Sequence, residues 1–505
     1  MNFMKIKVNG NVNEYYVQTL SMLFFPGAKF SDKDTDDGGP HLYVDVRDDD
    51  TGVECDAEMT DGQKCAHGHY SCDWIVGETR QRVIKIAVGK AVFEAGKELF
   101  KLTPPWGILI GVRPTKVPMG YLLQGHGIRE TQNILKNEYF LNAKKAQLVT
   151  GIASYEMKLT KKMTGKYCSV YISIPFCPSR CAYCSFVSYT SKRLLSLLDE
   201  YLVQLKKEIS EIFKVISEKG YKVATIYIGG GTPTILDECQ LADLLSHVEK
   251  CTDVSTLMEY TLEAGRPDTI TEEKLAVAKQ YGVTRISVNP QSLSDVVLEA
   301  IGRKHNAQQF FSAYEIARKS GIRDINIDLI AGLPMDNFIR FSRTVDKIAE
   351  LDPENITIHT FSVKKASDIL RQSNDIYTLG TGMAAKCIDY SQVKMRNSGY
   401  KPYYMYRQKN TVENLENVGY AKEGHEGLYN IFMMEEYHTI FAAGAGAVTK
   451  LVDYNTPSNG GCRIKRIFNP KYPYEYLRGA EQLEKKYREL SAIHDEFYSE
   501  RDILV

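Results

Sequence analysis

Short apolar runs alternate with longer stretches of helical periodicity between about residues 167 and 364. This alternation is typical of βα units that build a parallel sheet, so the pattern predicts an α/β fold. The runs that read as buried strands are Val170–Ile174, Val223–Ile228, Met258–Leu262, Thr284–Val288, Asp324–Ile330 and Asn355–Thr360. Because these are fewer than the eight strands of a closed barrel, we expect a partial (β/α)6 barrel with its site at the carboxyl ends of the strands.

The segment before this core, residues 1–160, has a mixed pattern. Alternating apolar and polar residues predict a strand at His41–Val46. Helical periodicity of the apolar residues predicts helices at Gln81–Leu99 and Asn142–Met157. We therefore expect a separate N-terminal α+β domain.

The segment after the core is rich in tyrosine, glycine and charge. It contains a small-residue run at Ala442–Ala447 and a predicted helix from Tyr474 onward. The chain should thus have three domains: 1–160, the α+β domain; 161–375, the partial barrel; and 376–505, a small C-terminal domain that covers the substrate at the barrel opening.

Composition restricts the partners. The 505 residues carry 63 Lys plus Arg and 63 Asp plus Glu, so no general basic surface favours nucleic acid or acidic membranes, and a small-molecule substrate fits better. The segment Met1–Glu14 is polar without an export signal, and uncharged stretches such as Tyr16–Ala28 are shorter than the roughly 20 residues of a membrane span. The 11 cysteines are an odd number without a secretory context, which predicts reduced thiols and a cytoplasmic protein.

Three cysteines lie close together directly after the first predicted strand, in Tyr171-Ile-Ser-Ile-Pro-Phe-Cys177-Pro-Ser-Arg-Cys181-Ala-Tyr-Cys184. The C-x3-C-x2-C spacing can place three thiolates on three corners of one [4Fe–4S] cluster and leaves the fourth iron without a cysteine. A structural zinc site is the alternative, but zinc normally takes four protein ligands and no second pair lies nearby.

Polar residues and glycines occupy the ends of the following strands. Gly230 and Gly231 would let the backbone approach a ligand closely. Glu263 and Asp328 can accept hydrogen bonds from hydroxyl or ammonium groups, and Arg303 can pair with a carboxylate.

These motifs together resemble the radical-SAM superfamily and, within it, the oxygen-independent coproporphyrinogen III oxidase family. The resemblance covers about residues 170–365 and includes Gly229-Gly-Gly-Thr-Pro-Thr234, Thr261-Leu-Glu263-Ala, Arg285-Ile-Ser-Val-Asn-Pro-Gln291, Ile301-Gly-Arg303-Lys-His305 and Asn326-Ile-Asp328-Leu-Ile-Ala-Gly-Leu-Pro334. It implies that the open iron chelates the methionyl end of S-adenosylmethionine (SAM) and reduces its sulfonium, giving a 5′-deoxyadenosyl radical. The positions that match SAM-contacting residues are Tyr171, Tyr183, Gly230, Gly231, Thr232, Glu263, Gln291, Arg303 and Asp328.

The N-terminal extension, Gly111-Val-Arg-Pro-Thr-Lys116 and Glu354-Asn-Ile-Thr-Ile-His359 resemble the HemZ-like branch of this family. That branch implies coproporphyrinogen III dehydrogenase activity, in which the radical takes a hydrogen from the β-carbon of a propionate and loss of one electron and CO2 leaves a vinyl group. Two propionates react, so two SAM are consumed per protoporphyrinogen IX, and an electron donor such as flavodoxin or ferredoxin is implied. No catalytic residue beyond the cluster and SAM site is assigned.

Two departures keep other activities open. Oxidases of the family often carry a fourth cysteine where this chain has Phe186, and phenylalanine there also occurs in the haem-chaperone branch. The chaperone's own His-Asn-x-x-Tyr-Trp run aligns with Tyr429–Met434, which lacks the histidine. The alternatives are a haem-trafficking, chaperone-like protein and a tetrapyrrole-cleaving radical-SAM methyltransferase.

Several further residue groups could bind a ligand but are also explained by ordinary surface or packing roles. Cys65, His67, His69 and Cys72 can ligate zinc, although their glycine- and aspartate-rich surroundings predict a loop. Basic residues that can pair with propionates are Arg113, Lys116, Lys364, Lys365, Lys401 and Arg407. Residues that can contact a tetrapyrrole or transfer a proton are Tyr400, Tyr403, Tyr404, Tyr406, His359, His425 and His438.

Overall fold

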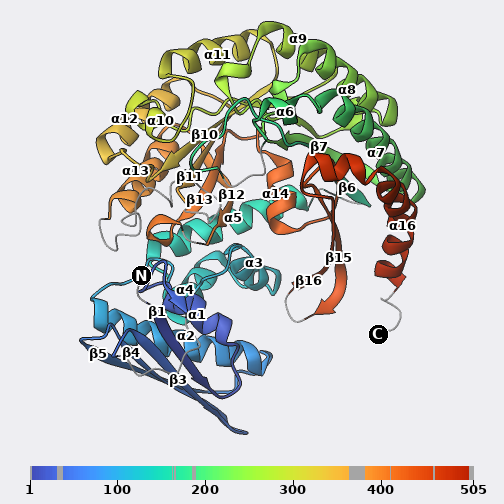
Figure 1. Ribbon diagram of the computed structural model, residues 1–505. Helices are drawn as coiled ribbons and strands as arrows, with labels where there is room; N and C mark the ends of the chain where they lie inside the picture. Colours follow the sequence, from blue (N-terminus) through green and yellow to red (C-terminus); the bar gives the residue numbers. More distant parts are fainter. Residues whose placement is uncertain are drawn as a thin grey trace. The chain divides into compact units, whose positions relative to one another are not determined.

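A computed structural model of the chain describes residues 3–30, 38–161, 163, 166–184, 189–362, 382–409, 411–458 and 461–499. Its internal contacts divide the chain into two compact units. The first comprises 1–157, 374–382 and 405–416, and the second comprises 158–373, 383–404 and 417–505. Figure 1 colours the chain by residue number, so most of the first unit is blue to cyan and most of the second is green to red.

The first unit contains, in its described part, a five-stranded sheet in the order β2-β1-β3-β4-β5. The strands are β1 (Phe3–Asn9), β2 (Lys29–Phe30), β3 (His41–Asp48), β4 (Gly52–Thr60) and β5 (Cys65–Asp73). β1 pairs in parallel with β2 and β3, whereas β3, β4 and β5 are antiparallel. Alternating side chains of β3 and β4, such as Leu42, Val44 and Met59, are buried on one face.

Helix α2 (Arg80–Phe100) packs against β4 and β5 and covers this apolar face. Thr79 caps its amino end, because the Thr79 hydroxyl accepts a hydrogen bond from the Arg82 N–H. The other helices of the unit are α1 (Glu14–Ser21), α3 (Lys116–Leu123), α4 (Ile128–Glu138) and α5 (Ala143–Thr160), of which α5 ends at the boundary of the second unit. The predicted strand and both predicted helices of this domain are confirmed.

The loop predicted for Cys65–Cys72 is wrong, since these residues form most of strand β5. Ala66 is buried, whereas Cys65, His67 and His69 face solvent. Buried and exposed residues alternate along a strand whose one face is solvated. The sequence did not predict this strand because the residues of β5 are small or polar on both faces.

The second unit is built on six parallel strands in sequence order, and all six predicted strands are present. They are β6 (Tyr167–Ile174), β7 (Lys222–Gly230), β8 (Glu259–Leu262), β9 (Arg285–Ser287), β10 (Asp324–Ala331) and β11 (Asn355–Thr360). The intervening helices are α6 (Lys192–Leu195), α7 (Leu198–Glu218), α8 (Glu238–Cys251), α9 (Glu272–Gln280), α10 (Asp295–Ala300), α11 (Ala307–Lys319), α12 (Phe338–Glu350), and the short 3-10 turns η1 (Pro233–Ile235), η2 (Val254–Thr256) and η3 (Pro267–Thr269). Figure 1 shows α7, α8, α9, α11 and α12 around the outside of the strands. The architecture is the expected partial (β/α)6 barrel.

C-terminal strands extend this sheet at both edges, so that it has eleven strands within the described residues. After α13 (Met383–Asn397), β12 (Lys401–Arg407), η6 (Val412–Asn414) and β13 (Glu416–Ala421) follow, and β13 pairs antiparallel with β11. After α14 (Leu428–Glu435), strand β14 (Thr439–Ala443) pairs in parallel with β6 and is followed by β15 (Val448–Ser458) and β16 (Gly461–Phe468). Helices α15 (Pro473–Arg478) and α16 (Ala480–Ser499) end the described chain. The segment expected to form a small separate domain is therefore continuous with the barrel sheet, through long-range pairing that local sequence does not reveal. In the described part of the chain, no helix is both long and apolar enough to cross a membrane.

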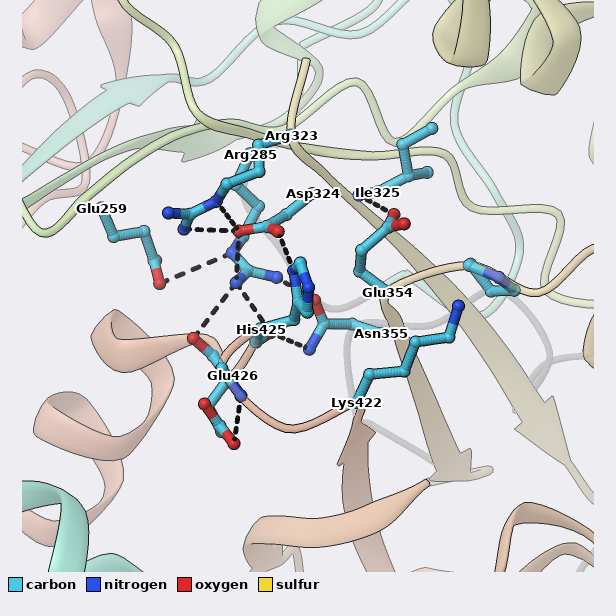
Figure 2. Close-up of polar contacts among 12 residues, drawn as sticks. Glu259, Arg285, Arg323, Asp324, Ile325, Glu354, Asn355, Lys422, His425 and Glu426 are labelled. Carbon is cyan, nitrogen blue, oxygen red and sulfur yellow. Dashed lines mark hydrogen bonds and ion pairs between the residues drawn. The ribbon is translucent and has the colours of Figure 1, made fainter. Parts of the chain in front are cut away.

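A buried polar network joins the amino ends of four neighbouring strands (Figure 2). Glu259, Arg285, Asp324 and Asn355 are the first residues of β8, β9, β10 and β11. The Arg285 guanidinium lies 3.5 Å from a Glu259 oxygen and 3.1 Å from an Asp324 oxygen, and it also donates to the Asn355 side chain. These charges lie at the opposite end of the strands from the cysteine loop, which gives them a structural role.

The network also positions helix α14. Arg285 donates to the backbone carbonyls of His425 and Glu426, and the His425 ring lies 2.6 Å from Asp324. A Glu259 oxygen accepts a hydrogen bond of 2.6 Å from the Leu428 N–H, the first of α14. The first N–H groups of a helix have no partner within the helix, and Glu259 accepts from one of them. The polar network at the amino ends of the strands thus fixes where α14 begins.

Candidate active site

The cysteine loop leaves the carboxyl end of β6. Cys177 and Cys181 are buried and Cys184 is half-buried. The Cys177 N–H donates to the Tyr189 carbonyl at 3.1 Å, and the Ala182 N–H donates to the Ile301 carbonyl at 3.0 Å. The first bond closes the loop on itself, and the second holds it against the end of α10.

Two side chains from neighbouring strand ends face the thiols. The Thr232 hydroxyl oxygen lies 3.2 Å from Cys177 Sγ. Arg266 Nη1 lies 3.8 Å from Cys181 Sγ and donates to the Ser179 hydroxyl at 2.9 Å, while Asp268 fixes the same guanidinium at 2.8 Å. The Arg266 guanidinium is thus held in place with one N–H directed at the Cys181 sulfur. The sequence interpretation missed Arg266, although it follows Glu263 by three residues.

The glycine turn after β7 packs directly on the backbone that leads into the cysteine loop. Gly230 has a φ of +115°, which a residue with a side chain rarely adopts. A Cβ at Gly231 would lie 2.4 Å from the Phe176 carbonyl oxygen, and the Thr232 N–H donates to that same oxygen at 2.8 Å. The glycines thus place Thr232 beside Cys177.

Asp328 lies in β10 within a shell of hydrogen-bond donors. Asn289 Nδ2 donates to one carboxylate oxygen at 2.9 Å and Asn326 Nδ2 to the other at 2.7 Å, and His359 Nε2 lies 3.6 Å from the first. Burial acts to raise the pKa of Asp328, but the hydrogen bond and charge of His359, with Asn326 and Thr357, hold this pKa below its usual value. Asp328 is therefore an anion inside the barrel.

Glu263, directly after β8, is protonated more readily than Asp328. Burial and the nearby Asp328 charge raise its pKa from 4.5 to about 8, although the Gly230 N–H and Tyr227 favour the ionised form. The ligand-free site thus has one anionic and one neutral carboxyl group at pH 7, an arrangement of two carboxyl groups that can accept or release one proton.

This difference predicts a pH dependence of stability. Because the pKa of Glu263 is higher in the folded chain than in the unfolded chain, its contribution is complete below about pH 4.5 and is lost as the pH rises through about 8. We expect the unfolding midpoint of ligand-free protein to fall more steeply between about pH 5 and 8 in the wild type than in Glu263→Gln. Parallel profiles for the two proteins, measured by thermal unfolding across this range, would contradict the assignment.

Three further predicted residues lie at the same end of the barrel. Arg303 donates to the Tyr183 hydroxyl at 3.0 Å and to the Gly265 carbonyl at 3.1 Å. The Gln291 N–H donates to the Asp328 carbonyl at 3.1 Å, whereas its buried side-chain oxygen has no hydrogen-bond partner among the described residues. A buried acceptor of this kind is costly unless a ligand or an ordered water donates to it.

Tyr171 forms a stack with two tyrosines that the sequence interpretation did not connect to it. The Tyr227 and Tyr429 ring centroids lie 4.6 Å apart with the planes 25° from parallel, and Tyr171 stacks at 6.0 Å from Tyr227. Tyr429 belongs to α14, and its buried hydroxyl has no hydrogen-bond partner among the described residues. Long-range packing brings these rings together beside Glu263, whose charge adds to the burial that raises the pKa of all three phenols.

Other sequence candidates are elsewhere. Arg407 is buried over the Trp106 ring and donates to the Leu109 and Asn414 carbonyls, so it is not available to a propionate. Tyr400, Tyr403 and Tyr404 are buried in the core, and exposed Lys401 pairs with Glu423 at 2.7 Å. His359 belongs to the site through Asp328, whereas His425 lies in the base network and His438 contacts Ser169 at 2.7 Å. Tyr406 is half-buried in β12. Lys116 is the first residue of α3, and Arg113 lies in the segment before this helix. Phe186, Lys364 and Lys365 are outside the described residues.

The residues present fit a cubane cluster and a polar cofactor beside it. Three thiols lie on one short loop with a guanidinium directed at one sulfur, and hydrogen bonds to cluster sulfurs are a known means of setting the reduction potential. The neighbouring strand ends offer an anionic carboxylate, a neutral carboxyl group and an unpartnered amide oxygen. Ribose hydroxyls, an ammonium group and an adenine amine can each donate to such acceptors.

The chain is similar to known proteins in the same region. Residues 171–348 match the radical SAM superfamily model. The "oxygen-independent coproporphyrinogen-III oxidase-like protein HemZ" of Bacillus subtilis is 39% identical over 379 residues, which are 74% of either chain. The "heme chaperone HemW" of the same organism is 32% identical over 313 residues, covering 61% of this chain and 77% of the relative.

A solved structure shares the fold. Coproporphyrinogen III oxidase (HemN) from Escherichia coli, described as a radical SAM enzyme, superposes with a TM-score of 0.50 at 19% identity and covers 65% of this chain and 72% of its own. The partial barrel therefore has a counterpart of known structure.

Proposed function

This chain belongs to the oxygen-independent coproporphyrinogen-III oxidase-like family of radical SAM proteins, and we propose that it is a coproporphyrinogen III dehydrogenase that converts two propionates to vinyl groups. The observation that carries the tetrapyrrole assignment is the 39% identity to the HemZ relative over 74% of the chain. The site supports radical chemistry because a three-cysteine loop lies beside polar acceptors at the strand ends.

In this proposal Cys177, Cys181 and Cys184 hold one [4Fe–4S] cluster, and the strand ends bind SAM. When bound, the cluster supplies the electron that cleaves SAM. Arg266 would donate a hydrogen bond to the Cys181 sulfur, and the Thr232 hydroxyl lies beside Cys177. The residues proposed to contact SAM are Tyr171, Tyr183, Gly230, Gly231, Thr232, Glu263, Gln291, Arg303 and Asp328.

The chain's own groups would orient SAM rather than react with it. Asp328 offers a charged acceptor fixed by Asn289 and Asn326, so little reorganisation is needed when a ligand donates to it. Gln291 supplies a neutral acceptor from the segment that follows β9. Tyr227 and Tyr429 form an apolar wall beside these acceptors, which limits water in the site.

Asp328→Asn is expected to keep the fold and the cluster but to weaken SAM binding. A hydrogen bond to a charged group contributes on the order of 1.5 to 3 kcal/mol, so the affinity should fall by roughly tenfold to more than a hundredfold. Glu263→Gln should cost less at pH 7, because Glu263 is already neutral there. SAM affinity and iron content, measured on the same anaerobic preparation, test both variants.

Asp346→Asn is the matched control, since Asp346 lies on α12 and pairs with Tyr390 and Lys394 outside the site. Wild-type affinity in Asp328→Asn with an intact cluster would refute its role in SAM binding. Cluster loss in Asp328→Asn would show a structural role instead.

A haem-trafficking, chaperone-like function is the second candidate. The HemW relatives favour it, since the one from Bacillus subtilis is 32% identical and this chain covers 77% of its length. The chaperone branch's histidine, however, aligns with Tyr429, a buried ring in the tyrosine stack.

Anaerobic incubation with coproporphyrinogen III, SAM and reductant separates these functions. The proposed dehydrogenase gives protoporphyrinogen IX by mass and two 5′-deoxyadenosines per product. Haem binding without porphyrinogen turnover would favour the chaperone, and a methylated or ring-opened product would favour a methyltransferase. We also propose a cytoplasmic location and a flavodoxin or ferredoxin as electron donor, in keeping with 11 cysteines that form no disulfide.

A further inference from the structure

The solvent face of the N-terminal sheet carries a group of metal-binding side chains far in sequence from the cysteine loop. Cross-strand pairing aligns Glu58 of β4 with His67 of β5, and Thr60 with Cys65. On the other side, β3 places Tyr43 opposite Glu58 and His41 opposite Thr60. Because alternate residues of a strand share a face, Glu58, Cys65, His67 and His41 all project to the same side of the sheet.

Their donor atoms converge. One ligand atom from each of Glu58, Cys65 and His67 lies within 4.8 Å of the others. Cys65 Sγ is 3.8 Å from His67 Nε2, and His67 Nδ1 is 3.8 Å from a Glu58 oxygen. Because these two distances involve different nitrogens of the His67 ring and an ion binds one of them, the ring or a neighbouring side chain must rotate when metal binds.

A second layer positions the carboxylate. His41 Nε2 lies 3.5 Å from the other Glu58 oxygen, and His41 is itself fixed by stacking on Tyr43 at 4.4 Å. A histidine that holds a ligating carboxylate is a common outer-shell arrangement in metal sites. His41 thus acts as a positioning residue for Glu58.

We propose that Glu58, Cys65 and His67 bind one zinc ion, separate from the iron–sulfur cluster. Thiolate, imidazole and carboxylate are the ligands that zinc takes in proteins, and two anionic ligands neutralise its charge. Three protein ligands leave one position of the tetrahedron open. Since the His67 side chain is 72% exposed, this position faces solvent and the metal is exchangeable.

The neighbouring group on the same face does not suit a cation. Glu54, Asp56 and His69 also converge, but Arg47 pairs with both carboxylates, at 3.3 Å with Glu54. His69 pairs with Asp56 at 2.8 Å. The guanidinium already supplies the positive charge there, so a metal ion would have to displace it.

The structure also corrects the grouping that the sequence suggested. Cys72 pairs opposite Val53, whose side chain is buried, and thus lies on the face of β5 that α2 covers. Cys72 cannot join Cys65 and His67 on one ion, and His69 belongs to the Arg47 group. Glu58 takes the third position instead.

The test uses full-length protein whose cluster cysteines cannot compete for metal. In a Cys177→Ala/Cys181→Ala/Cys184→Ala background, zinc affinity is measured by competition with a chromophoric chelator, and cobalt is used as a spectroscopic probe. We expect one zinc per chain and, with cobalt, a thiolate-to-metal charge-transfer band. Cys65→Ser should remove the band, and Cys65→Ser or His67→Ala should each weaken zinc binding by more than the roughly tenfold to hundredfold typical of outer-shell changes.

His69→Ala and Cys72→Ser are the matched controls and should bind zinc as the background protein does. The same titration on cluster-loaded wild-type protein should show the same additional zinc. The proposal is overturned if no stoichiometric zinc binds, if Cys65→Ser and His67→Ala bind it unchanged, or if His69→Ala loses it equally. None of these readouts depends on SAM or tetrapyrrole chemistry.

Discussion

Replacing any one of Cys177, Cys181 and Cys184 with alanine is expected to abolish both the iron–sulfur cluster and SAM cleavage. Each thiolate would bind one iron, and the loop between β6 and α6 has no further cysteine that could take over. The wild-type protein should carry about four irons per chain after anaerobic reconstitution, because one triplet has the required spacing. Iron and sulfide content, visible absorption and 5′-deoxyadenosine formation measure the effect.

Cys239→Ser is the matched control, since Cys239 is exposed on α8, and its iron content should equal that of the wild type. SAM cleavage that persists in any one of the three alanine variants would rule out the cluster assignment. So would wild-type iron content in Cys181→Ala.

Arg285→Met is expected to destabilise the barrel by about 3–5 kcal/mol, because it leaves the buried Glu259 carboxylate without its counter-charge. The Glu259 side chain is 3% exposed, so water cannot replace the guanidinium, whereas Asp324 keeps its contacts with Arg323 and His425. The substitution should also loosen the segment that leads into α14, because Arg285 donates to the His425 and Glu426 carbonyls. Denaturant unfolding followed by circular dichroism measures the change.

Lys347→Met provides the comparison, since it breaks an exposed pair with Glu350 on α12. Surface ion pairs contribute little to stability, so the free energy of unfolding of Lys347→Met should differ from that of the wild type by no more than about 0.5 kcal/mol. Equal unfolding midpoints for Arg285→Met and the wild type would mean that the network at the base of the barrel does not stabilise it.

The sequence predicted the features that are encoded locally. The six strands were readable because each is a short β-branched run, and the cysteine loop because its spacing is specific for a cluster. The order of the strands in the sheet then followed from the rule that successive βα units lie side by side.

Features that depend on long-range contacts were not predictable. The placement of β14 beside β6 pairs residues 439–443 with 168–172, and no local pattern announces it. Tyr429 joins Tyr171 and Tyr227 only through the position of α14. The reading of Cys65–Cys72 as a loop failed for a different reason, since polar residues on one face hid a regular strand.

The position of β6 between β7 and β14 bears on how the protein matures on the ribosome. Ser169 of β6 and His438, next to β14, are 269 residues apart in the chain yet hydrogen-bonded. During synthesis, β6 therefore has one unpaired edge until residues 439–443 have emerged, and such edges are prone to aggregation.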